Sequence, residues 1–147
     1  MRLPYRRNMV NHTPTMADEQ FDMIAKTLFG LEDILAEELR TLGADGVETG
    51  RRMVAFRGDK AMLYKANFHC RTALRILKPV ARFRAENADE VYRAVKDVEW
   101  EQYLTPERTF AVEAVVYSES FRHSKFVAYR TKDAIADHFK ERSGRRP

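Results

Sequence analysis

FDMIAKTLFGLEDILAEELRTLG, residues 21–43, predicts a β-strand followed by an amphipathic α-helix. Residues 21–28 alternate apolar and polar side chains well enough for a strand, and Gly30 ends it. Glu32 and Asp33 fall in the expected first turn of the helix, where the helix dipole favours negative charge. The apolar side chains of the helix recur at helical spacing and form one stripe: Leu31, Ile34, Leu35, Leu39 and Leu42.

The rest of the chain continues to alternate between strand and helix patterns. Further strands are expected at residues 47–49, 53–57, 76–84 and 109–117, and further helices at residues 58–73, 88–98 and 125–142. The order β-α-β-β-α-β up to residue 84 is the plan of a ferredoxin-like module. The predicted fold class is therefore α/β (α+β), with a ferredoxin-like subdomain over residues 21–80 and a second module over residues 81–147.

The composition indicates a folded protein rather than a disordered or membrane-spanning one. The chain has 147 residues, of which 44% are hydrophobic and 33% charged, a usual balance for a globular protein. No apolar run approaches the roughly 18 residues that a membrane span requires. Residues 1–20 lack periodicity and are expected to be a disordered leader. The single Cys70 cannot form an internal disulfide, so a reducing compartment, the cytoplasm, is expected.

Positive charge is concentrated at the two ends of the chain. The last thirty residues hold eight Lys/Arg against four Asp/Glu, and this surplus equals the net charge of +4 for the whole protein. Residues 1–16 add three Arg and no acid, so the segment between the ends is mildly acidic. A localised positive surface is typical of proteins that bind a polyanion, because neutralising phosphates releases condensed counterions.

The basic C-terminal segment supplies the candidate binding residues. Ser124 is expected to cap the last helix. The free backbone N–H groups of the first helical turn, next to the cations of this segment, would then form an anion site. Phe121 or Tyr129 could stack on an unpaired base. The expected phosphate contacts are Arg122, Lys125, Arg130, Lys132, Lys140, Arg145 and Arg146. The alternative is a solvated helix whose aromatic side chains lie in the core and whose cations serve the helix dipole.

The sequence holds no recognisable catalytic or metal-binding motif. Neither G-x-G-x-x-G, nor the phosphate-binding loop G-x-x-x-x-G-K-[ST], nor C-x-x-C occurs. His69 and Cys70 are adjacent, but no further ligand or base stands at a recognisable spacing from them. We therefore expect a histidine on a helix face beside a buried thiol. Neither catalytic residues nor a metal site are predicted.

Several segments together resemble the THUMP region of large-subunit rRNA guanine-N2 methyltransferases and of related enzymes called N6-adenine-specific methylases. TLFGLEDILAEELRTLGA (27–44) is similar to the opening strand and helix of that family, and RTALRILKPVARFRA (71–85) to its middle helix and strand. VEWEQYL (98–104) and TFAVEAVVY (109–117) are similar to the segment that leads into the THUMP core. The pattern K-D-A-I-x-D-x-F-[RK]-x-x-x-G-x-R-P is matched by Lys132, Asp133, Ala134, Ile135, Asp137, Phe139, Lys140, Gly144, Arg146 and Pro147.

The resemblance implies a ferredoxin-like subdomain followed by a THUMP domain that binds RNA, most simply ribosomal RNA, for an attached methyltransferase domain. That catalytic domain binds S-adenosylmethionine through a glycine-rich loop and an [ND]-P-P-[YF] motif, and neither occurs here. The family's THUMP domain continues past the R-P with further strands, so a C-terminally incomplete front end is expected, without cofactor of its own. The alternatives are the THUMP region of a tRNA-thiolation enzyme, or a ferredoxin-like structural module that docks on an acidic protein surface.

Overall fold

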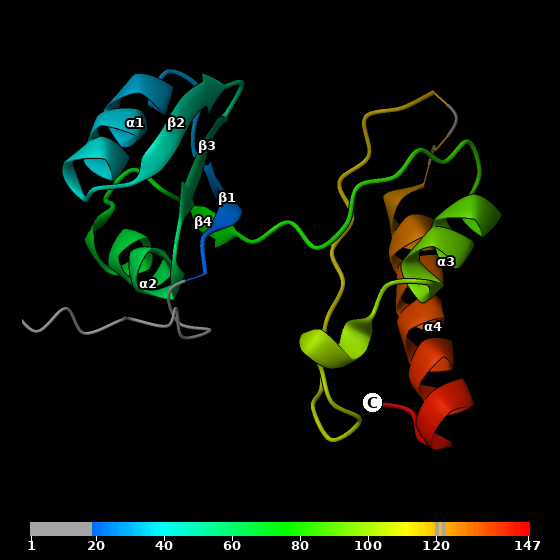
Figure 1. The fold of residues 1–147 in the computed structure, drawn as a ribbon. Coiled ribbons are helices and arrows are strands. Elements are labelled where there is room, and N and C mark those ends of the chain that lie inside the picture. Colours follow the sequence, from blue (N-terminus) through cyan, green and yellow to red (C-terminus); the bar gives the residue numbers. More distant parts are fainter. Residues whose placement is uncertain (1–18, 120, 122) are drawn as a thin grey trace, which may run out of the picture. The chain divides into compact units, whose positions relative to one another are not determined.

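The computed structural model describes residues 19–119, 121 and 123–147. The expected leader, residues 1–20, thus falls almost entirely outside the described residues. The chain divides into two compact units, one ending at Val80 and one beginning at Ala81. Each unit has a hydrophobic core of its own. We call them unit 1 and unit 2 (Figure 1).

Unit 1 is a four-stranded antiparallel sheet with two helices, in the chain order β-α-β-β-α-β (Figure 1). Its elements are β1 (Phe21–Lys26), α1 (Glu32–Thr41), β2 (Asp45–Gly50), β3 (Met53–Gly58), α2 (Lys60–His69) and β4 (Arg75–Leu77). The strands lie in the order β2-β3-β1-β4, so the first strand is central. This arrangement confirms the ferredoxin-like plan that the sequence predicts.

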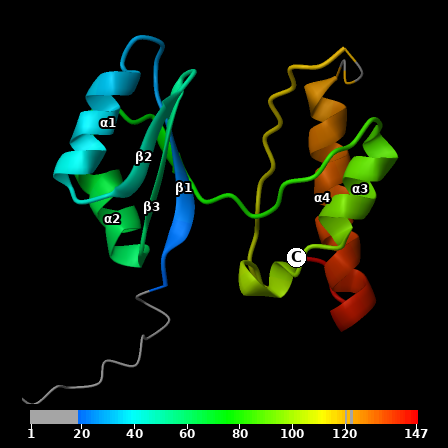
Figure 2. The same cartoon turned by 45° about the horizontal axis from the view of Figure 1, so that its top comes forward.

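The helices of unit 1 pack on one face of the sheet (Figure 2). Alternate residues of β1 and β3 point to that face, because successive side chains of a strand point to opposite sides. Their buried side chains form one cluster with buried residues from both helices: Met23, Ala25, Val54, Phe56, Leu35, Ala36, Leu39, Met62 and Ala66. Helix α2 begins at Asp59, whose carboxylate accepts a hydrogen bond from the Met62 backbone N–H at 2.7 Å.

Unit 2 is built on two helices that pack side by side, α3 (Ala88–Lys96) and α4 (Ser124–Ser143), joined through a short 3₁₀ helix η1 (Trp100–Gln102) (Figure 1). Asn87 caps α3 by accepting from the backbone N–H groups of Asp89 and Glu90. Gly144 ends α4 in the left-handed conformation, with φ of 70°, which glycine adopts without strain. Among the described residues, no helix is both long and apolar enough to cross a bilayer.

The core of unit 2 lies between the two helices and the segment that connects them. Its buried residues are Val91, Val95, Ala134, Ile135 and Phe139. Partly buried side chains from the connecting segment cover this cluster, among them Trp100, Phe110 and Val112. The indole N–H of Trp100 donates to the Val95 carbonyl at 2.7 Å and so ties the connection to the end of α3.

Two expected strands differ from the structure. Residues 109–117 are not a strand, although half-buried and exposed side chains alternate from Phe110 to Tyr117 as the sequence pattern predicts. Alternation with a period of two indicates an extended segment with one side toward a core. A β-strand also needs hydrogen bonds to a neighbouring strand, and no described segment pairs with this one. The strand expected at residues 76–84 covers only Arg75–Leu77 and stops before Pro79, which cannot donate to a sheet.

Candidate nucleic-acid interface

Helix α4 separates a buried face from an exposed stripe of lysines. Ala134, Ile135, His138 and Phe139 are buried, as the helical spacing predicts for this side of the helix. Lys125, Tyr129, Lys132 and Lys140 are all exposed, and their spacing of 4, 3 and 8 residues places them within an arc of about 80°. We call these four residues the α4 stripe. Because an α-helix turns by about 100° per residue, the stripe is centred about 130° around the helix from these buried residues, and only Phe139 falls close to it.

Two of the arginines expected to contact phosphates make ion pairs within unit 2. Arg130 pairs with Asp89 of α3 at 2.7 Å, and its guanidinium lies 4.4 Å from the centre of the Tyr92 ring. Arg146 pairs with Asp137 at 2.9 Å. The expected phosphate contacts Arg130 and Arg146 are therefore partly neutralised by carboxylates of the protein itself. An arginine in such a pair must leave its partner before it can bind a phosphate.

The lysines of the stripe are not held in this way. Within residues 19–119, 121 and 123–147, no carboxylate lies within ion-pair distance of Lys125, Lys132, Lys140 or Arg145. An exposed ammonium group without a carboxylate partner can bind a phosphate directly, whereas a paired one must first leave its partner. The structure thus divides the predicted basic cluster into cations that hold unit 2 together and cations that remain available.

The ion pairs on the other side of α4 fix it against α3. The hydroxyl of Tyr92 donates to Asp137 at 2.9 Å, and this bond, with the Arg146 charge, lowers the pKa of that carboxyl. Lys96 donates to Glu141 at 2.6 Å, and this hydrogen bond raises the pKa of the lysine. The orientation of α4, and with it the direction of the α4 stripe, therefore depends on these polar contacts with α3. In one of them α3 supplies the cation, and in the Arg130–Asp89 pair it supplies the carboxylate.

The start of α4 differs from the expected anion site. The N-cap residue is His123, with extended backbone angles and no side-chain capping bond, and Ser124 is the first residue of the helix. The expectation that Ser124 caps the helix is therefore wrong. Serine favours that position, but the preference is a bias of about 1 kcal/mol that the surrounding structure overrides. Arg122, also expected here, lies outside the described residues.

The two aromatic side chains expected to stack on bases differ in exposure. Tyr129 is 63% exposed and lies in the α4 stripe between Lys125 and Lys132. Phe121 is half-buried and packs against the core cluster of unit 2. Phe126, in the first turn of α4, is 55% exposed. A ring must present a free face in order to stack on a base, so Tyr129 is the better placed of the two.

The His69–Cys70 pair lies at the end of α2, away from any cluster of ligands. His69 is exposed and Cys70 is half-buried. Burial, with a smaller contribution from the Glu38 charge, raises the pKa of the Cys70 thiol to about 11, which disfavours the reactive thiolate. In the described part of the chain, no three His, Cys, Asp or Glu side chains are grouped closely enough to hold a metal ion.

His138 joins α3, η1 and α4 through both of its ring nitrogens. Its Nδ1 lies 2.7 Å from the Lys96 carbonyl oxygen, and its Nε2 lies 3.0 Å from both carboxylate oxygens of Glu101. Arg142 also reaches Glu101, at 3.3 Å. The hydrogen bond from His138 lowers the pKa of Glu101, and the Arg142 charge adds to this. Glu101, which the sequence did not single out, is therefore the carboxylate on which this junction depends.

We expect Glu101→Gln to weaken unit 2 at neutral pH and to flatten its acid unfolding. A carboxyl whose folded pKa lies below its ordinary value of 4.5 stabilises the fold above that value, and the stabilisation is lost as the pH falls through the folded pKa. Urea unfolding at pH 7 and near pH 4 measures both effects. Glu107→Gln, an exposed carboxylate in the same unit, is the control and should follow the wild-type profile. Parallel pH profiles for Glu101→Gln and the wild type would contradict the role given to this junction.

Comparison with known proteins gives both units a family. Residues 22–77 match the family model of the RlmL ferredoxin-like domain, and residues 85–147 match that of the THUMP domain. The chain is 42% identical over 118 residues to the ribosomal RNA large subunit methyltransferase K/L of Syntrophotalea carbinolica, which corresponds to 80% of this chain and 16% of that relative.

Solved structures agree with this assignment. SMU.472, "a putative methyltransferase complexed with SAH", has a TM-score of 0.79 at 27% identity, over 86% of this chain and 34% of that one. A predicted N6-adenine-specific DNA methylase from Listeria monocytogenes has the same TM-score of 0.79 at 28% identity, over 86% of this chain and 33% of that one. The chain spans well under half the length of each of these proteins. It carries an RlmL ferredoxin-like domain followed by a THUMP domain, and this confirms the resemblance and the fold class expected from the sequence.

Proposed function

We propose that this chain is the RNA-binding front part of an S-adenosylmethionine-dependent methyltransferase of ribosomal RNA, and that the α4 stripe is its contact with the RNA backbone. The observation that carries the proposal is the unpaired lysine stripe on the last helix of the THUMP domain. The name of the Syntrophotalea carbinolica relative, a ribosomal RNA large subunit methyltransferase, supports the choice of RNA.

The spacing of the stripe suits a chain of phosphates. With a rise of about 1.5 Å per residue, Lys125 and Lys132 are about 10 Å apart along the helix, and Lys132 and Lys140 about 12 Å. At these separations the three ammonium groups bind different phosphates. Arg145 extends the set beyond the end of α4, and Tyr129 supplies a ring on which a base stacks.

The other expected contacts take secondary places in this proposal. Ser124 offers its backbone N–H at the first turn of α4, where the helix dipole favours an anion. Arg122 precedes it in the sequence. Arg130 and Arg146 join only if a phosphate replaces Asp89 or Asp137 as their partner. Phe121 is left to the core of unit 2.

The methyl donor belongs to a part of the protein outside this sequence. SMU.472 was solved with SAH, the product form of that cofactor, which supports S-adenosylmethionine for the whole protein. The residues of this chain do not fit the cofactor, because the glycines with positive φ form no glycine-rich loop: Gly30, Gly43 and Gly144 stand at turns and a helix end, and Gly46 at the irregular start of β2. We therefore propose that the second partner of this chain is the protein's own methyltransferase domain. The task of this chain is then to bind RNA and present it to that domain.

The dependence of RNA affinity on salt tests this function. We expect the 147-residue chain to bind a fluorescein-labelled single-stranded fragment of large-subunit rRNA, with a log–log slope of affinity against salt of about −3. Four phosphate contacts, from Lys125, Lys132, Lys140 and Arg145, account for this slope at about −0.7 each. Fluorescence anisotropy at several salt concentrations measures it. A slope near zero, or equal affinity for a sulfated polysaccharide, would contradict RNA recognition by this helix.

A further inference from the structure

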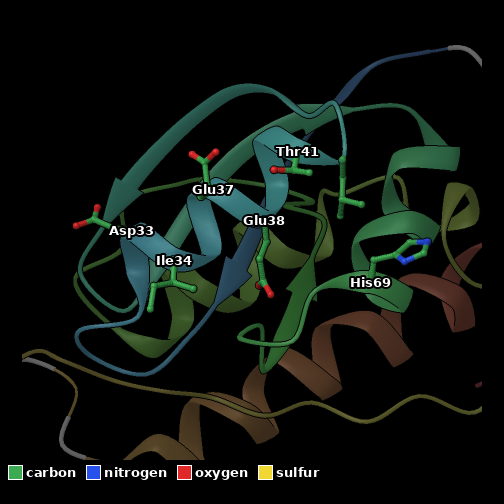
Figure 3. A pocket seen from close by; sticks show the side chains of 7 residues that line it. Asp33, Ile34, Glu37, Glu38, Thr41 and His69 are labelled. Atoms are coloured by element: carbon green, nitrogen blue, oxygen red, sulfur yellow. The ribbon is translucent and has the colours of Figure 1, made fainter.

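The outer face of unit 1 carries a hollow between α1 and α2. One part of it, of about 580 Å³, is lined by residues of α1 and by His69 at the end of α2 (Figure 3). A second part, of about 480 Å³, is lined by residues of α2, and His69 lines it as well. The two parts adjoin at His69, and we call them together the α1–α2 groove. The volume is enough for a few side chains of a partner.

Large apolar side chains line this groove and remain exposed to water. Phe68 is 84% exposed, Tyr64 is 64% exposed and Ile34 is 53% exposed. The sequence predicts that Ile34 belongs to the buried stripe of α1, and the structure places it on the rim of the groove instead. Exposed apolar side chains that gather around a hollow mark a surface that another molecule covers.

The charge of the groove selects the kind of molecule. Asp33, Glu37 and Glu38 line the α1 side, where α1 carries four carboxylates against the single cation Arg40, and among the described residues Lys65 is the one lysine that lines the α2 side. Figure 3 shows Asp33 and Glu37 projecting from α1 on the side away from His69, which lies across the hollow on α2. Such a surface repels the phosphates of RNA and attracts ammonium and guanidinium groups.

The carboxylates of the groove are held to different degrees. Glu38 accepts hydrogen bonds from the hydroxyl and backbone N–H of Thr72, at 2.7 and 3.2 Å, so it braces the turn after α2. Glu37 makes only an exposed pair with Arg40 at 3.7 Å. No described cation lies within ion-pair distance of Asp33. Asp33 and Glu37 are therefore the two that a basic partner can use.

We propose that the α1–α2 groove binds a basic protein segment whose apolar side chains pack on Ile34 and on Phe68. Lysine or arginine residues beside these apolar side chains pair with Asp33 and Glu37. The ligand class is a cationic, amphipathic peptide segment of a partner protein. This surface belongs to unit 1 and the proposed RNA contacts belong to unit 2, so the groove is independent of the function proposed above.

A labelled model peptide tests the groove directly. The probe is a short fluorescein-labelled peptide of lysine and leucine in amphipathic order, titrated with the full chain. We expect saturable binding that weakens about tenfold in the double variant Asp33→Lys, Glu37→Lys, and about tenfold in Phe68→Ser. All three substituted side chains are exposed, so the fold should be retained, which circular dichroism checks. Glu48→Lys, an exposed carboxylate on β2, is the matched control and should bind as the wild type does.

Other outcomes would overturn the proposal. Equal binding of a peptide with glutamate in place of lysine would remove the role of charge. Unchanged affinity in Asp33→Lys, Glu37→Lys would exclude the groove, as would dimers of the chain that block peptide binding at micromolar concentration. The RNA experiment tests α4 of unit 2, and the peptide experiment tests the groove of unit 1. A negative result in either experiment therefore leaves the result of the other unaffected.

Discussion

Replacing Lys125, Lys132 and Lys140 with alanine is expected to lower the affinity for single-stranded RNA about 100-fold at ~0.1 M salt. Each lysine that neutralises a phosphate contributes about 0.7 to the salt slope, so the slope should flatten by about 2. These side chains are exposed, and no described carboxylate pairs with them, so their loss removes binding charge without opening a contact inside the protein. Anisotropy titrations of the variant and the wild type at matched salt concentrations give both numbers.

A control of equal charge separates a local contact from general attraction. Lys60, Lys65 and Arg51 are exposed cations of unit 1, and their replacement with alanine removes the same net charge. We expect this control variant to lose less than threefold in affinity, since only cations in contact with phosphates release counterions. A loss as large as that of the α4 variant would show that total charge, and not the α4 stripe, drives binding.

Phe139→Ala is expected to destabilise unit 2 by about 3–5 kcal/mol, the usual range for removing a buried aromatic ring. Phe139 is 2% exposed and belongs to the small cluster between α3 and α4. A unit of this size has little stability to spare, so the variant should leave unit 2 largely unfolded at 25 °C. RNA binding should then be lost, because the α4 stripe depends on a folded helix.

The fluorescence of Trp100 allows the unfolding of unit 2 to be measured separately from that of unit 1. Trp100 is the only tryptophan of the chain and lies in unit 2, so its fluorescence follows the unfolding of that unit alone. Phe56→Ala is the matched variant in unit 1, where Phe56 is 1% exposed. It should leave the Trp100 transition in place while circular dichroism detects the loss of unit 1. A common shift of both transitions in either variant would contradict two separate cores.

The fold of unit 1 follows closely from local sequence signals. Apolar spacing over residues 31–42 predicts α1, and alternation predicts β1 and β3, which the structure confirms. The sequence does not foresee that Ile34 stays exposed. A stripe of apolar residues fixes which side of a helix faces the core, but not how far the neighbouring helix covers its edge.

Unit 2 is less predictable because its decisive contacts join residues far apart in the chain. The alternation over residues 109–117 reports one-sided burial correctly, yet it carries no information on a pairing partner. In the same way, its charge and its place in the chain group Arg130 with the lysines of α4, but its partner Asp89 lies 41 residues earlier. Helical spacing places His138 on the same side of the helix as Ala134 and Ile135, which are buried, whereas its bonds to Lys96 and Glu101 appear only once the helices are packed.

Mapping the RNA contact by amide chemical shifts tests the central claim most directly. The ¹⁵N-labelled chain is titrated with the single-stranded rRNA fragment, and shifts are followed at each residue. We predict the largest changes at Lys125, Tyr129, Lys132 and Lys140, with little change along the α1–α2 groove. Changes concentrated in unit 1, or on the side of α4 where Arg130 faces Asp89, would contradict the assignment of the α4 stripe as the surface that binds RNA.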